Sequence, residues 1–188
     1  MQRPFPFLYI TGGCRSGKSA FAQRTAEAMA PERLFLATAQ ALDAEMRDRI
    51  RLHQEARGPG WRLHECPQGG GAELWRDLAG LVREEEPLLF DCLTLWAAGL
   101  MLSDEEPPAF AENCDRLLAA LWSLPCPVLV VGNEVGMGLV PPTASGRAFR
   151  DMAGLAGQKA AALSTDVIFM VSGIPLAVKG RLPCQAET

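Results

Sequence analysis

Short apolar runs alternate along this chain with longer segments in which apolar and polar positions are mixed. Five of the runs are almost continuously apolar, which is typical of strands buried on both faces of a parallel sheet. They lie at 7–10, 33–38, 88–92, 128–132 and 167–171. Weaker strand patterns lie at 61–65 and 176–178, and we expect the second of these to be an edge strand.

The segments between the apolar runs predict helices. Strands that alternate with helices imply right-handed crossovers and a mostly parallel central sheet. The sequence therefore predicts an α/β protein with three layers. Helices are expected at 20–30, 42–54, 73–86, 109–124 and 146–162, and loops at 68–71 and 103–108.

A glycine-rich turn separates the first apolar run from the first predicted helix. Its sequence, GGCRSGKS, has the spacing G-x-x-x-x-G-K-[ST], in which glycines let backbone N–H groups converge on phosphate oxygens. The start of the following helix adds a partial positive charge. With a strand before it and a helix after it, the turn indicates a three-layer P-loop NTPase-like fold that binds a nucleoside triphosphate. The predicted nucleotide-binding residues of the turn are Gly12, Gly13, Cys14, Arg15, Ser16, Gly17, Lys18 and Ser19.

The same motif predicts a Mg²⁺ site. Lys18 is expected to reach the β- and γ-phosphates, and the Ser19 hydroxyl is expected to hold the metal ion. Asp91 follows the apolar residues 88–90, and P-loop enzymes use an acid in this position to support Mg²⁺ directly or through water. The alternative is that Asp91 caps the start of a helix at 93–102.

Composition narrows the possible partners. The chain has 188 residues, of which 48% are hydrophobic, and this length fits a single domain over residues 1–188. The net charge of −4 argues against a broad surface for nucleic acid or for an anionic membrane. The six cysteines form no C-x-x-C pair, so neither zinc ligation nor a disulfide framework is indicated. Without a signal peptide or a membrane span in the sequence, we expect the protein in the cytoplasm.

The segment 42–62 is dense in arginine, although acidic residues are interleaved with the basic ones. This density suits a phosphate-rich ligand, but a solvated, salt-bridged helix face explains the same pattern. His53 continues the apolar positions of the predicted helix, which favours a half-buried core side chain. The other hypothesis is that its neutral imidazole attacks an α-phosphorus and displaces pyrophosphate. The arginines of this segment are Arg47, Arg49, Arg51, Arg57 and Arg62.

Polar residues also follow other apolar runs. Because ligands collect at the carboxyl ends of parallel strands, we expect these residues to face the same crevice. Thr38 and Asn133 hold such positions. Glu134 is a candidate to act as a base or to orient a substrate hydroxyl, with a merely solvated loop carboxylate as the alternative.

Three further segments occur in order after the glycine-rich turn: DAEMRDRIRLH at 43–53, Trp61, and NEVGMGLVP at 133–141. With these motifs the chain resembles the bifunctional adenosylcobinamide kinase and adenosylcobinamide-phosphate guanylyltransferase family of cobalamin biosynthesis, over about residues 7–174. The resemblance implies two reactions. ATP or GTP phosphorylates the aminopropanol hydroxyl of adenosylcobinamide, and GMP is then transferred from GTP to that phosphate, which gives adenosylcobinamide-GDP and pyrophosphate.

The resemblance also assigns roles to residues. It implies that His53 carries GMP covalently and that the enzyme is a small homo-oligomer, usually a trimer. Departures lie at Leu52-His53, where some members have two histidines, and at 57–60, where others have a longer basic segment. Beyond the glycine-rich turn, the implied nucleotide contacts are Ala37, Thr38, Ala39, Gln54, Glu55, Ala56, Arg57, Glu65 and Asp91.

Two other functions fit the glycine-rich turn. A P-loop kinase acting on another alcohol would need no covalent histidine, and His53 would then be structural. A GTP-dependent switch would normally carry an Asn-Lys-x-Asp segment after a late strand, and the sequence has none. Covalent labelling of the protein by GMP distinguishes the bifunctional enzyme from both alternatives.

Overall fold

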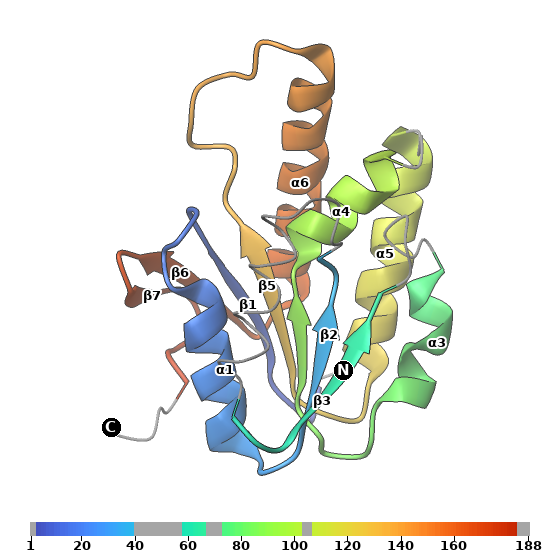
Figure 1. The fold of residues 1–188 in the computed structure, drawn as a ribbon, viewed down its shortest axis with the longest axis vertical. Helices are drawn as coiled ribbons and strands as arrows, with labels where there is room; N and C mark the ends of the chain where they lie inside the picture. Colours follow the sequence, from blue (N-terminus) through green and yellow to red (C-terminus); the bar gives the residue numbers. More distant parts are fainter. Residues whose placement is uncertain (1–2, 40–57, 67–72, 103–106, 184–188) are drawn as a thin grey trace.

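A seven-stranded sheet runs through the protein in the computed structural model, which describes residues 3–39, 58–66, 73–102 and 107–183 (Figure 1). The strands are β1 (Phe7–Gly12), β2 (Arg33–Ala37), β3 (Trp61–Glu65), β4 (Leu88–Asp91), β5 (Val128–Asn133), β6 (Asp166–Val171) and β7 (Ile174–Lys179). Their order across the sheet is β3-β2-β4-β5-β1-β6-β7. Every neighbouring pair is parallel except β6 and β7, which are antiparallel.

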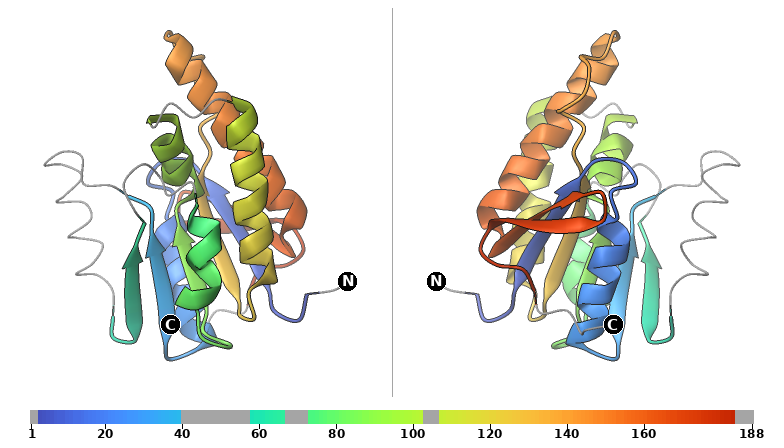
Figure 2. Two further views of the ribbon diagram at one scale, coloured as in Figure 1. Left: turned by 90° about the vertical axis from the view of Figure 1, so that its right-hand side faces the viewer. Right: turned by 90° about the vertical axis from the view of Figure 1, so that its left-hand side faces the viewer.

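Helices cover both faces of this sheet, which gives three layers (Figure 2). One face is covered by α1, whose Phe21, Ala22 and Ala26 pack against the strands. The other described helices pack against the opposite face. The helices are α1 (Lys18–Met29), α3 (Leu74–Leu81), α4 (Leu93–Leu102), α5 (Pro107–Ser123) and α6 (Ala144–Leu163).

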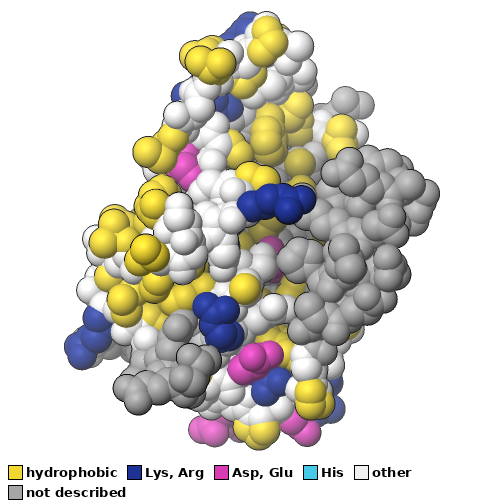
Figure 3. Space-filling model, turned by 60° about the vertical axis from the view of Figure 1, so that its left-hand side comes forward, with side chains coloured by type: hydrophobic (Ala, Val, Ile, Leu, Met, Phe, Trp, Pro, Cys, Tyr) yellow, Lys and Arg dark blue, Asp and Glu magenta, His cyan; other side chains and the backbone are white. Residues whose placement is uncertain are grey.

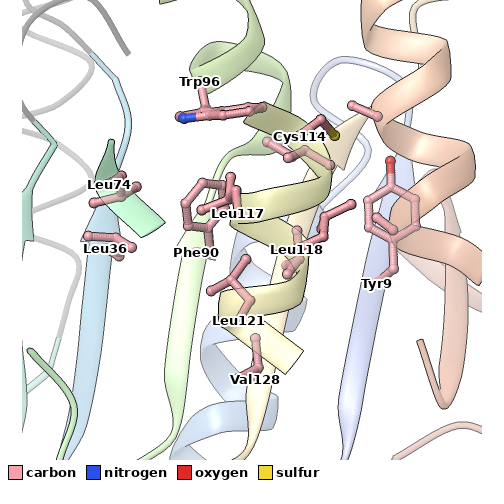
Figure 4. Close-up of a cluster of buried hydrophobic side chains, with 14 of the residues drawn as sticks. Tyr9, Leu36, Leu74, Phe90, Trp96, Cys114, Leu117, Leu118, Leu121 and Val128 are labelled. Carbon is pink, nitrogen blue, oxygen red and sulfur yellow. The ribbon is translucent and has the colours of Figure 1, made fainter. Parts of the chain in front are cut away.

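The larger core lies between the sheet and the four helices α3 to α6 (Figure 4). Phe7 and Tyr9 of β1 point into this core, whereas Leu8 and Ile10 point to the α1 side. Successive side chains of a strand point to opposite faces, and here both faces are buried. This double burial explains why the strand segments of the sequence are continuously apolar.

The strand predictions are confirmed, and the two weaker patterns form the edge strands β3 and β7. The expected mostly parallel sheet with three layers is confirmed as well. The predicted loop at 103–108 is wrong at its end, because α5 begins at Pro107, and proline fits the first turn of a helix, where its missing N–H has no partner to lose. The predicted helix at 42–54 and the loop at 68–71 lie outside the described residues.

The prediction for α3 is too long at its C-terminus. The helix ends at Leu81, before the predicted end at residue 86. Glu85 takes a positive φ of 62°, and the buried Glu86 carboxylate accepts the backbone N–H of Arg83 at 3.1 Å. These residues turn the chain into β4, which a pattern of helical spacing does not reveal.

The Glu86 carboxylate also pairs with Arg62 of β3. Nε and Nη2 of Arg62 donate to Glu86 at 2.8 and 2.5 Å, and Nη2 donates to the carbonyl oxygen of Leu81 at 2.9 Å. Burial raises the pKa of the Glu86 carboxyl, but hydrogen bonds and charges from Arg62 and Arg83 outweigh burial and lower the pKa overall. Arg62 therefore forms an ion pair, but it does so on a strand and with a carboxylate outside the arginine-rich segment, not on the expected helix face.

The antiparallel edge strand β7 carries a row of exposed apolar side chains. Ile174, Leu176 and Val178 alternate along it and are between 58% and 69% exposed. Figure 3 shows hydrophobic side chains gathered on this side of the molecule. The described helices include none whose length and apolar character would let it span a membrane.

Glu86→Gln should lower the free energy of unfolding by about 1–2 kcal/mol at pH 7, because Arg62 loses its charged partner. The pKa of Glu86 in the folded protein lies below the value of about 4.3 for an unfolded chain. The ionised carboxylate therefore stabilises the protein above that pH, and the stabilisation disappears as the pH falls through the folded pKa. Urea unfolding at pH 7 and at pH 3 measures the effect, with the exposed Glu84→Gln as control. An equally large difference at both pH values would contradict this account.

Candidate functional site

The glycine-rich turn joins β1 to α1, as the sequence predicts. β1 ends at Gly12, and α1 begins at Lys18 with Gly17 before it. The backbone takes positive φ values at Gly12 (148°), Arg15 (55°) and Gly17 (93°). Glycine adopts such a backbone without the strain that a Cβ atom would add. The turn therefore curls back ahead of the helix, whose first N–H groups have no partner within the helix.

Gly12 is also required by close packing against β6. A Cβ atom at this position would lie 2.5 Å from the carbonyl oxygen of Met170 and 2.9 Å from Oγ of Ser16. A Cβ atom at Gly13 would meet no heavy atom within 4 Å. The two adjacent glycines are therefore not equivalent, because packing excludes a side chain only at the first.

Lys18 lies beneath the turn. Its side chain is buried, and its Nζ donates to the carbonyl oxygen of Gly13 at 2.6 Å and to Oγ of Ser16 at 3.4 Å. A buried ammonium group is costly unless it is hydrogen-bonded, so these oxygens hold it in place. The positive charge is thereby kept at the turn, beside the start of α1.

Thr38, which follows β2, fixes the end of β4. Its Oγ1 accepts the N–H of Cys92 at 2.6 Å and donates to the carbonyl oxygen of Cys92 at 2.7 Å. Its own N–H donates to the carbonyl oxygen of Asp91 at 3.1 Å. Cys92 precedes α4, and its Sγ accepts the N–H of Leu95 at 3.4 Å. The position next to the helix thus belongs to Cys92, and Asp91 lies one residue earlier, at the end of β4.

Asp91 and Lys18, two predicted site residues, both act on the pKa of the Cys92 thiol. Burial, with a smaller contribution from the charge of Asp91, raises the pKa of Cys92 to about 12, although the charge of Lys18 acts to lower it. Both charges therefore lie close enough to act on the same thiol, although they come from β4 and α1. The thiol itself stays protonated at neutral pH, which excludes it as a nucleophile.

Ser19 and Asp91 fit the kind of Mg²⁺ site that P-loop proteins have. Among the described residues, no three His, Cys, Asp or Glu side chains form a cluster that could hold a metal by themselves. Mg²⁺ in P-loop proteins needs fewer protein ligands, because phosphate oxygens and water complete its shell. The hydroxyl of Ser19 in the first turn of α1 and the carboxylate of Asp91 match this smaller set.

The predicted site residues that the structure describes lie at the carboxyl ends of the parallel strands, in two groups. One group is the glycine-rich turn after β1, and the other lies at the ends of β2, β3 and β4. Ala37 of β2 is in register with Glu65 of β3 and with Asp91 of β4, and Thr38 and Ala39 follow Ala37 directly. At about 4.8 Å per strand, β3 lies about 19 Å from β1 across the sheet. Glu65 is therefore well separated from the glycine-rich turn. The predicted residues His53, Gln54, Glu55, Ala56 and Arg57 lie outside the described residues.

A hollow of about 260 Å³ opens beside the glycine-rich turn. Glu134 stands in its wall, with its N–H donating to the carbonyl oxygen of Gly12 at 2.9 Å and its Oε1 accepting the N–H of Gly136 at 2.5 Å. Arg150 of α6 donates to the carbonyl oxygen of Gly136. The sequence indicates Glu134 but not the wall at 169–172, because apolar strand residues are equally expected in a core. The lining residues are Gly13, Ser16, Glu134, Met137, Phe169, Met170, Val171 and Ser172.

Comparison with known proteins shows the family of the chain. The family model described as cobinamide kinase / cobinamide phosphate guanyltransferase matches residues 8–178. The chain belongs to this family. The chain is 37% identical over 191 residues to the bifunctional adenosylcobalamin biosynthesis protein CobU of Salmonella typhimurium, and 92% of this chain and 99% of the relative are covered. It is 39% identical over 176 residues to the bifunctional adenosylcobalamin biosynthesis protein CobP of Pseudomonas aeruginosa, with 92% and 96% covered. The family resemblance drawn from the sequence is thus confirmed.

Solved structures agree with this member of the cobinamide kinase family in their fold. The RadB recombinase superposes with a TM-score of 0.57 at 15% identity, and 96% of this chain and 84% of that chain are covered. The protein PH0250 of Pyrococcus horikoshii OT3 has a TM-score of 0.53 at 8% identity, with 93% and 86% covered. Likeness at such low identity concerns the fold alone, and it agrees with the predicted P-loop NTPase-like architecture.

Gly12→Ala should lower the free energy of unfolding by about 3 kcal/mol, because the new methyl group overlaps the Met170 carbonyl oxygen and the positive φ adds strain. Gly13→Ala is a matched control, since its methyl group enters open space and should cost less than about 0.5 kcal/mol. Urea unfolding without nucleotide compares the two variants. Equal stability of the two would refute the packing described for Gly12.

Proposed function

We propose that this chain phosphorylates the aminopropanol hydroxyl of adenosylcobinamide with ATP or GTP and then transfers GMP from GTP to the resulting phosphate. The second step gives adenosylcobinamide-GDP and pyrophosphate. The family match over residues 8–178 carries this proposal, because the matched range includes the glycine-rich turn and the ends of β5 and β6, the strands on either side of β1. Both reactions take place on one domain, residues 1–188, in the cytoplasm, where both nucleotides are supplied.

The geometry of the glycine-rich turn supports binding of the triphosphate. Backbone N–H groups of the turn and of the first turn of α1 would bind phosphate oxygens. Lys18 would exchange its hydrogen bond with Gly13 for one with a β- or γ-phosphate oxygen. Ser19 and Asp91 would hold Mg²⁺, which neutralises charge on the phosphates when it is bound.

His53 is the residue proposed to carry GMP, and its place in the motif DAEMRDRIRLH supports this role. An imidazole nitrogen forms a bond to the α-phosphorus of GTP as the bond to the bridging oxygen breaks, and the electron pair leaves on pyrophosphate. A phosphate oxygen of adenosylcobinamide phosphate then attacks the same phosphorus and releases His53. The implied nucleotide contacts at 37–39, 54–57 and Glu65 belong to the same proposal.

Self-association into a homo-oligomer, a trimer by family resemblance, is part of the proposal. The exposed row of Ile174, Leu176 and Val178 on β7 supports it, because covering apolar surface is favourable. The exposed edge of the same strand also has backbone groups that another chain could pair with. The number of subunits stays a prediction.

His53→Ala should abolish covalent labelling of the protein by GTP that carries a label on its α-phosphate. The reason is that the imidazole is the only proposed acceptor of GMP. His64→Ala is the matched control, because His64 lies on β3 and the proposal gives it no role in either reaction. Denaturing electrophoresis measures the label, which should be labile in acid and stable in base, as expected of a histidine phosphoramidate.

Retained labelling in His53→Ala would refute the covalent role of His53. No labelling of the unsubstituted protein, together with transfer of γ-phosphate to an alcohol, would instead support a P-loop kinase without a covalent histidine. Hydrolysis of nucleotide without either transfer would support a GTP-dependent switch. These three outcomes separate the functions that fit the glycine-rich turn.

Lys18→Ala should slow both phosphorylation and guanylyl transfer by about 10²-fold or more, because both are proposed to use one triphosphate site. Circular dichroism checks that the fold survives the loss of a buried side chain. Lys159→Ala, which removes a surface ion pair with Asp115, should leave both rates unchanged. An unchanged guanylyl transfer rate in Lys18→Ala would show that the two reactions use different sites.

A further inference from the structure

Only one step of the proposed function requires a group that takes a proton from an alcohol, and the inference below rests on that function. A hydroxyl group must lose its proton as its oxygen attacks phosphorus. In guanylyl transfer, the attacking atoms are an imidazole nitrogen and a phosphate oxygen, which already have an available electron pair. A carboxylate base in this site would therefore serve the phosphorylation step alone.

Among the described residues, three acidic residues lie at or directly after the carboxyl ends of parallel strands. Glu65 on β3 lies about 19 Å from β1 across the sheet, and Asp91 on β4 lies about 10 Å from it. Glu134 follows β5, which adjoins β1 at about 5 Å. Of these three side chains, Glu134 is the one beside the strand that carries the glycine-rich turn.

Contacts between the two segments confirm this proximity. The N–H of Glu134 donates to the carbonyl oxygen of Gly12 at 2.9 Å, so the residue is joined to the first glycine of the turn. Its side chain lines the hollow together with Gly13 and Ser16. Among the described residues that line this hollow, Glu134 alone has a carboxylate or any other charged group.

The carboxylate of Glu134 is held in one orientation. Its Oε1 accepts the N–H of Gly136 at 2.5 Å, and the carbonyl oxygen of Gly136 is bound by Arg150 of α6. The described residues offer no hydrogen-bond donor to the second oxygen, Oε2. A fixed carboxylate with an available oxygen is what a proton acceptor in a binding hollow requires.

We propose that Glu134 is the catalytic base of the phosphorylation step. As the hydroxyl oxygen of the acceptor forms its bond to the γ-phosphorus, the bond from that phosphorus to the bridging oxygen breaks. ADP or GDP leaves with the electron pair, and the hydroxyl proton moves to Oε2 of Glu134. Met137 and Phe169, which line the same hollow, provide apolar contact for the carbon atoms next to the hydroxyl.

Glu134→Gln tests this proposal, because the amide keeps an oxygen for the N–H of Gly136 but cannot accept a proton. One assay follows the γ-phosphate of labelled ATP to adenosylcobinamide, and a second follows GMP from α-labelled GTP to the protein. The kcat of phosphorylation should fall about 10²- to 10⁴-fold, while the KM for ATP and the GMP labelling stay within about threefold. Glu84→Gln, a charge removed at the opposite end of the sheet, should change neither reaction.

Glu134→Ala provides a second readout that a merely structural role would not produce. Formate is a carboxylate smaller than the side chain that Glu134→Ala removes, so it can take the place of the lost carboxylate. Added formate should raise the kcat of phosphorylation by this variant about tenfold or more, and should leave the unsubstituted protein unchanged. A positioning role for the loop predicts no such recovery.

Two results would overturn the proposal. Phosphorylation by Glu134→Gln within about threefold of the unsubstituted protein would exclude Glu134 as the base. An equal loss of both reactions, without recovery by formate in Glu134→Ala, would assign the residue to the folding of the loop. A different result, in which the unsubstituted protein phosphorylates no adenosylcobinamide, would remove the proposed function first and this role of Glu134 with it.

Discussion

The close fit of the glycine-rich turn between two strands is the constraint on which the candidate site depends. β1 is flanked by β5 and β6, so the turn that follows it leaves the sheet through a narrow space. Gly12 makes this possible because the Met170 carbonyl oxygen occupies the volume that a side chain would need. The N–H of Glu134 and the carbonyl oxygen of Ser16 then join the turn to the segments after β5 and β6. The start of α1, and with it the lysine of the motif, takes its position from these contacts.

Two other sets of hydrogen bonds hold the segments that follow β4 and β5. Thr38 binds both backbone groups of Cys92, which fixes the end of β4 and the start of α4 without a charged group. Arg150 of α6 binds the carbonyl oxygen of Gly136 in the loop after β5. Arg147, also of α6, binds the carbonyl oxygens of Pro141 and Pro142 later in the same loop. The two bonds between Thr38 and Cys92 are buried, and hydrogen bonds gain strength in a poorly hydrated interior. The backbone that carries the polar groups of the site is thus held by contacts from the segment after β6, from Thr38 and from α6.

Sequence patterns predicted the strands well because a strand buried on both faces must be apolar throughout. They also predicted the glycine-rich turn, whose spacing is set by local geometry. The end of α3 was missed because Arg62, which lies on β3, binds both the carbonyl oxygen of Leu81 and the carboxylate of Glu86 in the turn after the helix. The bonds from Thr38 to Cys92 and the wall formed by Phe169 were missed for the same reason. Register between distant strands decides these contacts, and local spacing carries no information about it.

The bond between Ser16 and Gly173 joins the glycine-rich turn to the connection between β6 and β7. The same connection leads into the strand whose apolar side chains are exposed. A ligand in the turn and a protein surface on β7 would therefore act on two segments that this hydrogen bond joins. Thermodynamic linkage requires that any change one of them makes in the affinity of the other be returned by the same factor. Nucleotide affinity would then depend on protein concentration, and self-association on the nucleotide that is bound.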